Sequence, residues 1–496
     1  MSRKPVRLLI IVAGFALPLV YAPVAMAIGE ESCDTRVNNT FQKLLTCVTV
    51  EGVREHQAAF QAIADANGGT RAAGTPGYDA SVEYVAEKME AAGYNVTLNA
   101  FPFVLVPPAL LQQLTPISAT YETGAFTGTG YGEVTAAVAA VDINLTPPRA
   151  NTSGCEAADF VGFPAGNIAL IQRGSCSFAI KALNAEAAGA SAVIIFNQGD
   201  APSREGLIIG TLGGTNVVGI PVVGASFAAG AALAQAGTTA YVKVDPPQNI
   251  TQYNVIAESK DGDPNNVVMV GAHLDSVQAG PGIQANGSGS AAILEVAEQM
   301  AKVKPRNKVR FAWWGAEESG LVGSTFYVNN LSQEEQDKIA LYLNFDMIGS
   351  PNHVFFIYDG DDSDGVGAGP GPAGSAEIEK TFERYFNLVG EPFKGTDFSG
   401  RSDYGPFIAV GIPAGGLFTG AEEIKTPEEA AIWGGTAGGQ YDPCYHLACD
   451  TFANINLHAL EINVDAIAYA VLQYAMNTKE INGVRGKGNF RLAPGQ

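Results

Sequence analysis

The amino-acid sequence predicts an α/β fold in which a mixed β-sheet is flanked by helices and interrupted by a mostly-β insert. Three apolar segments of strand length occupy residues 266–270, 309–314 and 341–345, and each is followed by histidine or carboxylate side chains. Because ligands of open α/β sheets bind at the carboxyl ends of the strands, these side chains should meet at one edge. Residues 105–247 differ in composition and pattern, with short Val/Ala/Ile strands, many glycines and no histidine.

A helical region is expected before the insert, over residues 28–104. Within it, residues 78–93 place apolar side chains at helical spacing and end in Gly93, a typical helix stop. Residues 94–103 then alternate as a strand does. Since this region precedes the insert and the three apolar strands follow it, we expect the main domain to be assembled from both flanks, residues 28–104 and 248–480.

Four residues of the types that bind zinc lie far apart in the second half of the chain. They are His273, Glu318, Asp346 and His446, with Glu317 as a spare carboxylate beside one of them. Zinc binds imidazole nitrogen and carboxylate oxygen, and a catalytic site also needs a base that deprotonates water. Asp275 is placed to hold the other ring nitrogen of His273. The set is typical of a metallohydrolase.

These fragments resemble the secreted zinc aminopeptidases of the M28 family. The segments HLDS, WWGAEESGLVGS, NFDMIGSPN, GRSDYGPF and DPCYHLACDT stand in the family's order between about Thr251 and Asn477. The resemblance implies a zinc-exopeptidase-like sheet and a centre that holds two zinc ions. Residue by residue, it assigns one zinc to His273 and Asp346 and the other to Glu318 and His446. It also makes Glu317 the general base and Tyr445 a residue that helps hold the tetrahedral intermediate.

One position departs from the family pattern. Family members have an aspartate that bridges both zincs, typically within Asn-Asp-Asp/Asn-Gly-Ser-Gly, whereas residues 283–289 here read Ile-Gln-Ala-Asn-Gly-Ser-Gly. The bridging carboxylate falls on Ala285, whose methyl group cannot bind zinc, so the repulsion between two nearby cations is not offset. We expect a single or weakly bound zinc and reduced activity, unless the neutral amides of Gln284 or Asn286, which are poor zinc ligands, supply an oxygen.

The insert at residues 105–247 resembles a protease-associated (PA) domain. The resemblance rests on residues 167–197, which read as a strand, an Arg-Gly turn, an amphipathic helix and a second strand. In relatives such a module lies over or beside the active-site cleft and is thought to restrict substrate access. Before the insert, residues 71–77 (RAAGTPG) resemble the R-x-x-G-T/S-x-G stretch near the start of family peptidase domains, although a glycine-rich turn accounts for them equally well.

The resemblance also implies a substrate pocket and an activity. Arg401, within GRSDYGPF, is expected near the amino-acid part of the substrate, and an apolar pocket around Phe418 would favour large hydrophobic residues. The expected function is release of N-terminal residues from peptides or proteins by zinc-activated water.

Two other functions remain open from the sequence. A catalytically silent binding protein could keep the fold and the insert after losing its metal chemistry, although the retained Glu317, Asp275 and Tyr445 argue against it. A carboxypeptidase or a glutaminyl cyclase is possible within the same fold, and a cyclase uses a single zinc. The AEESG and DPCYHLACDT segments look more like those of aminopeptidases.

Residues 1–27 have the pattern of a signal peptide, with a basic start, an apolar run and Ala25-Met26-Ala27 as an A-x-A-type cleavage site. The run is also long enough for an uncleaved anchor, but Pro18 and Pro23 interrupt it. Six cysteines behind such a segment favour disulfides and a secreted, extracellular or periplasmic protein. Fifteen connectivities are possible, and nearness favours Cys33–Cys47, Cys155–Cys176 and Cys444–Cys449.

The chain is strongly acidic, with a formal net charge of −21 from 29 basic and 50 acidic residues. This balance argues against nucleic acid as a partner. We expect a monomer that has no membrane contact after signal cleavage. The aspartates of the glycine-rich loop at 361–374 could bind calcium, but they lack EF-hand spacing and are more often simply solvated. Residues 481–496 are expected to form a polar, basic tail.

Overall fold

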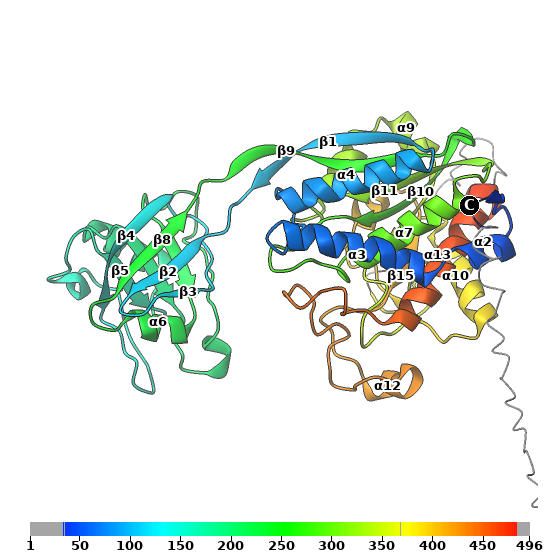
Figure 1. The fold of residues 1–496 in the computed structure, drawn as a ribbon. Coiled ribbons are helices and arrows are strands. Elements are labelled where there is room, and N and C mark those ends of the chain that lie inside the picture. Colours follow the sequence, from blue (N-terminus) through cyan, green and yellow to red (C-terminus); the bar gives the residue numbers. More distant parts are fainter. Residues whose placement is uncertain (1–32, 34, 368, 484–496) are drawn as a thin grey trace, which may run out of the picture. The chain divides into compact units, whose positions relative to one another are not determined.

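The computed structural model describes residues 33, 35–367 and 369–483 of the chain. The expected signal peptide and the part of the expected tail beyond residue 483 lie outside the described residues. The described residues divide into two compact units, the first made of those up to 101 together with those from 252 onwards, and the second of residues 102–251 (Figure 1).

An eight-stranded mixed sheet forms the centre of the first unit, in the order β1-β9-β11-β10-β12-β15-β13-β14. Its strands are β1 (Asn95–Leu105), β9 (Gln248–Glu258), β10 (Asp263–His273), β11 (Asn307–Trp314), β12 (Ile339–Phe345), β13 (Phe356–Tyr358), β14 (Lys394–Thr396) and β15 (Ala414–Phe418). Strands β11, β10, β12 and β15 are parallel, and β9 pairs with β11 in the antiparallel sense. The three expected apolar strands are therefore β10, β11 and β12, which lie side by side.

Both faces of this sheet are covered by helices, which explains why its central strands are apolar throughout. Val268 and Val270 of β10 belong to one core cluster, while Val267 and Met269 belong to another. Helices of the first cluster are α2 (Phe41–Cys47), α3 (Val50–Ala66), α4 (Pro76–Ala91), α7 (Gly287–Met300), α10 (Ser375–Val389) and α13 (Leu457–Met476). The second cluster contains side chains of α8 (Val322–Asn329) and α11 (Tyr404–Ala409). Helix α14 (Lys479–Asn482) adds Ile481 to the first cluster, and two further short helices are α9 (Gln333–Lys338) and α12 (Pro427–Trp433).

The helix expected over residues 78–93 is confirmed as α4, with a slightly earlier start. The side chain of Thr75 accepts a hydrogen bond from the backbone N–H of Tyr78, and Pro76 occupies the first turn, where its missing N–H costs nothing. The helix ends before Gly93, whose φ of 91° is accessible to glycine at little cost. The following strand is β1.

A seven-stranded sheet in the order β3-β2-β8-β4-β5-β6-β7 forms the second unit. Its elements are β2 (Leu110–Thr115), β3 (Ala119–Tyr121), β4 (Gly132–Val141), β5 (Ile168–Gln172), α5 (Phe178–Ala187), β6 (Ala192–Phe196), β7 (Val222–Ala225), α6 (Phe227–Leu233) and β8 (Thr239–Val244), with short 3-10 turns at Ala157–Phe160 and Pro202–Arg204. The expected strand, turn, helix and strand at residues 167–197 are β5, α5 and β6. Two apolar clusters fill this unit's core.

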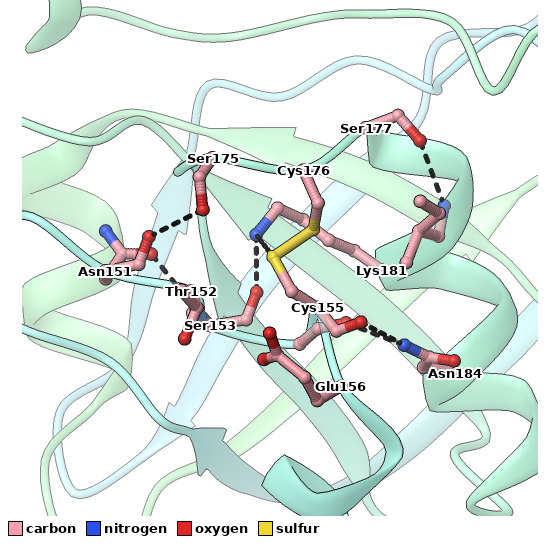
Figure 2. Close-up of a disulfide and its surroundings, with 12 residues drawn as sticks. Asn151, Thr152, Ser153, Cys155, Glu156, Ser175, Cys176, Ser177, Lys181 and Asn184 are labelled. Atoms are coloured by element: carbon pink, nitrogen blue, oxygen red, sulfur yellow. Dashed lines mark hydrogen bonds between the residues drawn. A yellow bond between two sulfur atoms is a disulfide. The ribbon is translucent and has the colours of Figure 1, made fainter.

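Three disulfides join the described cysteines: Cys33–Cys47, Cys155–Cys176 and Cys444–Cys449. Figure 2 shows the second of these beside the buried Lys181, whose ammonium donates to the carbonyl of Ser153 and lies 3.7 Å from the sulfur of Cys155. None of the described helices combines the length and the apolar character needed to cross a bilayer.

Candidate metal centre

The first pair of predicted ligands is formed by two strand ends. His273 ends β10 and Asp346 directly follows β12, and these strands are parallel neighbours. Their side chains meet with 3.3 Å between His273 Nε2 and Asp346 Oδ1. The hydroxyl of Ser402 donates to the other oxygen of Asp346 at 2.8 Å, which fixes that carboxylate in place.

The second pair lies on loops. Glu318 follows β11, and His446 belongs to the short loop that the Cys444–Cys449 disulfide closes. His446 Nε2 lies 3.0 Å from Glu318 Oε2. The ring of Tyr445 stacks on that of His446, with 3.7 Å between their centroids.

The spacing of the ligand atoms fits zinc. Two ligand atoms at about 2.0–2.1 Å from a tetrahedral zinc lie roughly 3.3 Å apart. The two pairs, at 3.3 Å and 3.0 Å, are close to that separation, and each combines an imidazole nitrogen with a carboxylate oxygen. His273, Glu317 and Asp346 also offer ligand atoms that all lie within 4.8 Å of one another.

Asp275 ties the first pair to the neighbouring strand end. Its backbone carbonyl lies 3.0 Å from His273 Nδ1, and its carboxylate lies 3.6 Å from the same nitrogen. The carboxylate accepts hydrogen bonds from the backbone N–H groups of Glu317 and Glu318, at 3.1 Å and 3.3 Å. Asp275 thus sets the direction of the His273 ring mainly through its carbonyl, and holds the two glutamates through its side chain.

Glu317 faces the first pair from a buried position, with Oε2 3.8 Å from His273 Nε2. Burial raises the pKa of Glu317 well above its usual range, against the lowering effect of protonated His273. Burial alone would lower the pKa of His273, but the carboxylates of Glu317 and Asp346 outweigh it, so the pKa is raised. Because zinc ligands must be deprotonated, a cation bound here would compete with protons for these groups.

Three non-glycine residues around the ligands adopt left-handed backbone conformations. They are Ala316, before the two glutamates, Met347, after Asp346, and His446 itself, with φ of 55°, 52° and 58°. Such residues are uncommon and concentrate at functional sites, where the surrounding structure enforces them. The turns that carry the ligands therefore keep an unfavourable left-handed backbone conformation, and this conformation sets the direction of the ligand side chains.

The position expected to carry the bridging carboxylate is lined by apolar side chains. Ala285 packs in a small cluster with Met347, Ala421, Phe418 and Tyr445. Its backbone N–H donates to Asp450 Oδ2 at 3.0 Å, and the preceding N–H donates to Asp450 Oδ1 at 2.8 Å.

Neither neighbouring amide replaces the missing carboxylate. The side chain of Asn286 caps α7 and bonds Met347 N and the carbonyl of Phe345. Gln284 donates to Ser350 Oγ at 3.0 Å, and its buried oxygen has no hydrogen-bond partner. Each half of the centre therefore fits zinc by its own nitrogen and oxygen donors, while the bridging position offers none.

A cavity of about 390 Å³ adjoins Asp346 in the first unit. Phe418 lines it together with Phe356, whose ring stacks on that of Phe418 at 5.9 Å. Arg401 and Tyr445 lie at its rim, where the guanidinium donates to the Tyr445 hydroxyl at 3.2 Å and pairs with Glu422 at 2.9 Å. Arg401 and Phe418, the two residues predicted to bind substrate, therefore line the same cavity as Asp346, one of the predicted ligands.

The predicted calcium loop is closed by its own hydrogen bonds. Asp359, Asp361 and Glu379 offer oxygens within 4.8 Å of one another. The backbone N–H of Ser363 donates to both Asp359 and Asp361, and that of Gly360 donates to Glu379. These bonds account for the arrangement, and calcium stays a prediction.

Sequence reasoning missed three residues that support the site. Ser402 and Asp450 act through the hydrogen bonds already described. Asp403 is fully buried, and burial raises its pKa to about 7, against the lowering effects of protonated His273 and of a hydrogen bond with Ser324. Asp403 and Ser402 follow Arg401 in a segment that sequence analysis singled out, whereas nothing in the sequence linked Asp450 to residues 284 and 285.

The mixed sheet, the two nitrogen and oxygen pairs and the facing carboxylate define a metal-dependent hydrolase. The model of peptidase family M28 matches residues 254–471, and the PA domain model matches residues 134–233. An aminopeptidase of Pseudomonas aeruginosa is 52% identical over 445 residues, which are 88% of this chain and 83% of that protein.

Two further likenesses agree with these matches. Leucine aminopeptidase 2 of Trichophyton rubrum is 50% identical over 337 residues, or 66% of each chain. The crystal structure of a zinc aminopeptidase from Bacillus subtilis aligns with a TM-score of 0.59 at 27% identity, covering 86% of this chain and 95% of that one. The chain therefore belongs to peptidase family M28 and contains a PA domain.

Proposed function

We propose that this M28 peptidase is a zinc-dependent aminopeptidase that removes large hydrophobic residues from the N-termini of peptides, with a metal centre weakened at position 285. The observation that carries the proposal is that five predicted site residues from four separate segments lie near one another, and that one of them, Asp346, lines the same cavity as Phe418. The aminopeptidase and leucine aminopeptidase relatives support the same activity.

In this proposal His273 and Asp346 hold one zinc, and Glu318 and His446 hold the other. When bound, zinc supplies Lewis-acid activation of the substrate carbonyl and lowers the pKa of water. Asp275 and Ser402 keep the ligands in position from outside, as the partners of metal ligands commonly do.

The remaining steps belong to side chains of the chain itself. Glu317 accepts a proton from the attacking water while the water oxygen bonds to the peptide carbonyl carbon. Glu317 then returns the proton to the leaving amine as the C–N bond breaks. Tyr445 donates a hydrogen bond to the developing oxyanion, and Arg401 helps hold it at the rim of the cavity.

Ala285 reduces this activity because it removes the anion that would lie between two cations. Each predicted zinc keeps only two protein donors. The oxygen of Asn286 is engaged by Gly289 and Met347, and Gln284 offers only a neutral amide oxygen, which is a poor zinc ligand. We infer a single or weakly held zinc and turnover lower by orders of magnitude than in a bridged centre.

The first experiment measures zinc-supplemented hydrolysis of leucine p-nitroanilide by the natural chain and by Ala285→Asp. Restoring the carboxylate should raise kcat/KM at least about a hundredfold, since metal-site partners are worth one to two orders of magnitude and a bridging ligand more. Zinc content per chain, measured on the same samples, should rise from one or less to two.

Ala285→Asn is the matched control, because it adds the same bulk without the negative charge. It should leave zinc content and activity near those of the natural chain. Two tightly bound zincs in the natural chain, or equal activity of the natural chain and the aspartate variant, would contradict the assigned role of position 285.

Two assays separate the remaining functions. Bestatin, an amino-acid inhibitor, should bind only in the presence of zinc, and zinc-independent binding would favour a silent binding protein. A peptide with N-terminal glutamine should lose that residue, whereas a cyclase would retain it as a ring.

We also propose that the chain is secreted. The pattern of residues 1–27 and the disulfides support this, because disulfides persist in oxidising compartments. Microsequencing of secreted protein should find Ile28 at its N-terminus.

A further inference from the structure

Arg71 is a fully buried arginine that the proposed chemistry does not use. Its side chain has no exposed surface, and no carboxylate lies within ion-pair distance among the described residues. The guanidinium instead donates to three backbone carbonyls, those of Leu274, Pro281 and Gly282, with 2.9 Å to the second and 2.8 Å to the third. Burying this charge is costly unless its donors are satisfied. The three hydrogen bonds therefore offset the cost of burying the guanidinium at this position.

The three carbonyls belong to one loop, which we define as residues 274–285. The loop begins directly after His273 and ends at Ala285, so its shape sets the distance between the first predicted zinc ligand and the bridging position. Further bonds close it: Thr70 Oγ1 donates to the carbonyl of Val277 at 2.9 Å, and the backbone N–H of Arg71 donates to Ser276 Oγ at 3.0 Å.

The end of the loop at residues 281–285 is held through its backbone N–H groups as well as through its carbonyls. Asp450 accepts the backbone N–H groups of Gln284 and Ala285, while Arg71 donates to the carbonyls of residues 281 and 282. Four charge-assisted hydrogen bonds thus fix the backbone of residues 281, 282, 284 and 285, and such bonds are stronger than neutral ones. Burial lowers the pKa of Arg71 to about 10, and the opposite charges of Asp275 and Asp450 partly oppose this.

The glycines of the RAAGTPG segment explain how Arg71 reaches this position. Gly74 has a φ of 83°, which turns the chain between Arg71 and α4. A Cβ at Gly77 would lie 2.1 Å from the carbonyl oxygen of Thr70, so only glycine lets the first turn of α4 pack against Thr70 and Arg71. The two glycines therefore allow the backbone path that places the Arg71 side chain against the loop.

We propose that Arg71 is a positioning residue of the metal centre, because its guanidinium holds loop 274–285 and thereby the separation of His273 from position 285. The role in metal binding rests on the proposed function, whereas the role in loop order does not. Lysine cannot replace it, since one ammonium cannot reach three carbonyls that the planar guanidinium spans.

The test compares Arg71→Lys and Arg71→Met with Arg310→Lys. Arg310 is a matched control because it also makes three side-chain hydrogen bonds, to Glu258 and Tyr327, but none to the loop. Two readouts are taken on each protein: zinc affinity by competition with a chelating dye, and hydrogen exchange of the zinc-free protein in peptides covering residues 274–286.

Both Arg71 variants should bind zinc about 10- to 100-fold more weakly than the natural chain, the usual cost of losing a residue that supports a metal ligand. Their amides at residues 283–285 should exchange faster in the zinc-free protein. Arg310→Lys should lose thermal stability while keeping zinc affinity and loop protection. If Arg71→Met does not fold, Arg71→Lys carries the comparison.

Natural zinc affinity and natural loop protection in Arg71→Lys would overturn the proposal. Equal losses in Arg71→Lys and Arg310→Lys would also overturn it, because they would show a general loss of stability. If the natural chain has no zinc-dependent peptidase activity, the proposed function fails, and exchange in the zinc-free protein still decides whether Arg71 holds the loop.

Discussion

The two ligand pairs of the candidate centre are built in different ways. His273 and Asp346 stand at the ends of adjacent parallel strands, and their side chains are 3% and 14% exposed. Glu318 and His446 lie on loops, and the His446 side chain is 37% exposed. The sheet therefore fixes the first pair, whereas a disulfide-closed loop and backbone bonds to Asp275 hold the second.

This difference indicates how the centre should respond to the missing bridge. A preorganised pair loses little conformational freedom when it binds an ion, while an exposed loop residue must be ordered first. If only one zinc remains, we expect it at the strand-end pair. The loop pair should be the more sensitive to changes in its surroundings.

Single-ligand variants test this ranking directly. His273→Ala should remove the tightly bound zinc and lower kcat/KM by about a thousandfold, whereas His446→Ala should lower it by about 10- to 100-fold. Zinc content after dialysis and kcat/KM, each in the natural chain and in the Ala285→Asp background, measure both effects. Equal zinc loss in the two variants would show that the pairs do not differ.

Opening the Cys444–Cys449 disulfide should affect only the loop pair. In Cys444→Ser combined with Cys449→Ser, the loop that carries Tyr445 and His446 gains freedom, and we expect about a tenfold loss of kcat/KM. Binding of the tightest zinc should not change.

The matched control for this variant removes the disulfide of the second unit, through Cys155→Ser and Cys176→Ser. That change should leave kcat/KM unaltered. A loss of the tightest zinc on opening Cys444–Cys449 would mean that His446, rather than His273, anchors the ion.

The strand-end pair was also the easier half to predict from sequence. An apolar run that ends in His273 or precedes Asp346 indicates a strand end, and parallel neighbours bring such ends together. The same reasoning predicted β10, β11, β12 and helix α4, because their patterns are local. Family resemblance, not periodicity, supplied His446, since a loop residue has no pattern of its own.

Residues that act through the backbone could not be predicted in this way. Asp450 and Arg71 hold loop 274–285 from segments about 165 and 210 positions away along the chain. Their partners are carbonyl and N–H groups, which every residue possesses, so no residue type in the loop reveals the contact. The sequence showed the RAAGTPG segment as a motif, and only the structure shows what its arginine binds.

The smallest effect on either pair is expected from a change in helix α7, which supports the strand-end pair. Asn286 caps α7 and bonds the backbone on either side of Asp346, and Ser290 of the same helix donates to the carbonyl of His273, so α7 supports the strand-end pair. Glu295 is a buried residue in the C-terminal half of α7. Burial raises the pKa of Glu295 to about 7, while a hydrogen bond from the backbone N–H of Thr49 partly opposes this rise. A carboxyl group with a raised folded-state pKa stabilises the protein fully below pH 4.5, and that contribution is lost as pH rises to about 7.

Glu295→Gln should therefore stabilise the first unit at pH 8 and change little at pH 4.5. A rise of roughly two pKa units corresponds to about 3 kcal/mol at most in the free energy of unfolding. Urea unfolding followed by tryptophan fluorescence measures this, because Trp313, Trp314 and Trp433, the three tryptophans, all belong to the first unit. The exposed Glu87→Gln on α4 is the control and should show no such pH dependence. Since no described contact joins Glu295 to either pair, kcat/KM and zinc affinity should stay unchanged; a loss of zinc from the strand-end pair would show that the charge of Glu295 acts on the centre through α7.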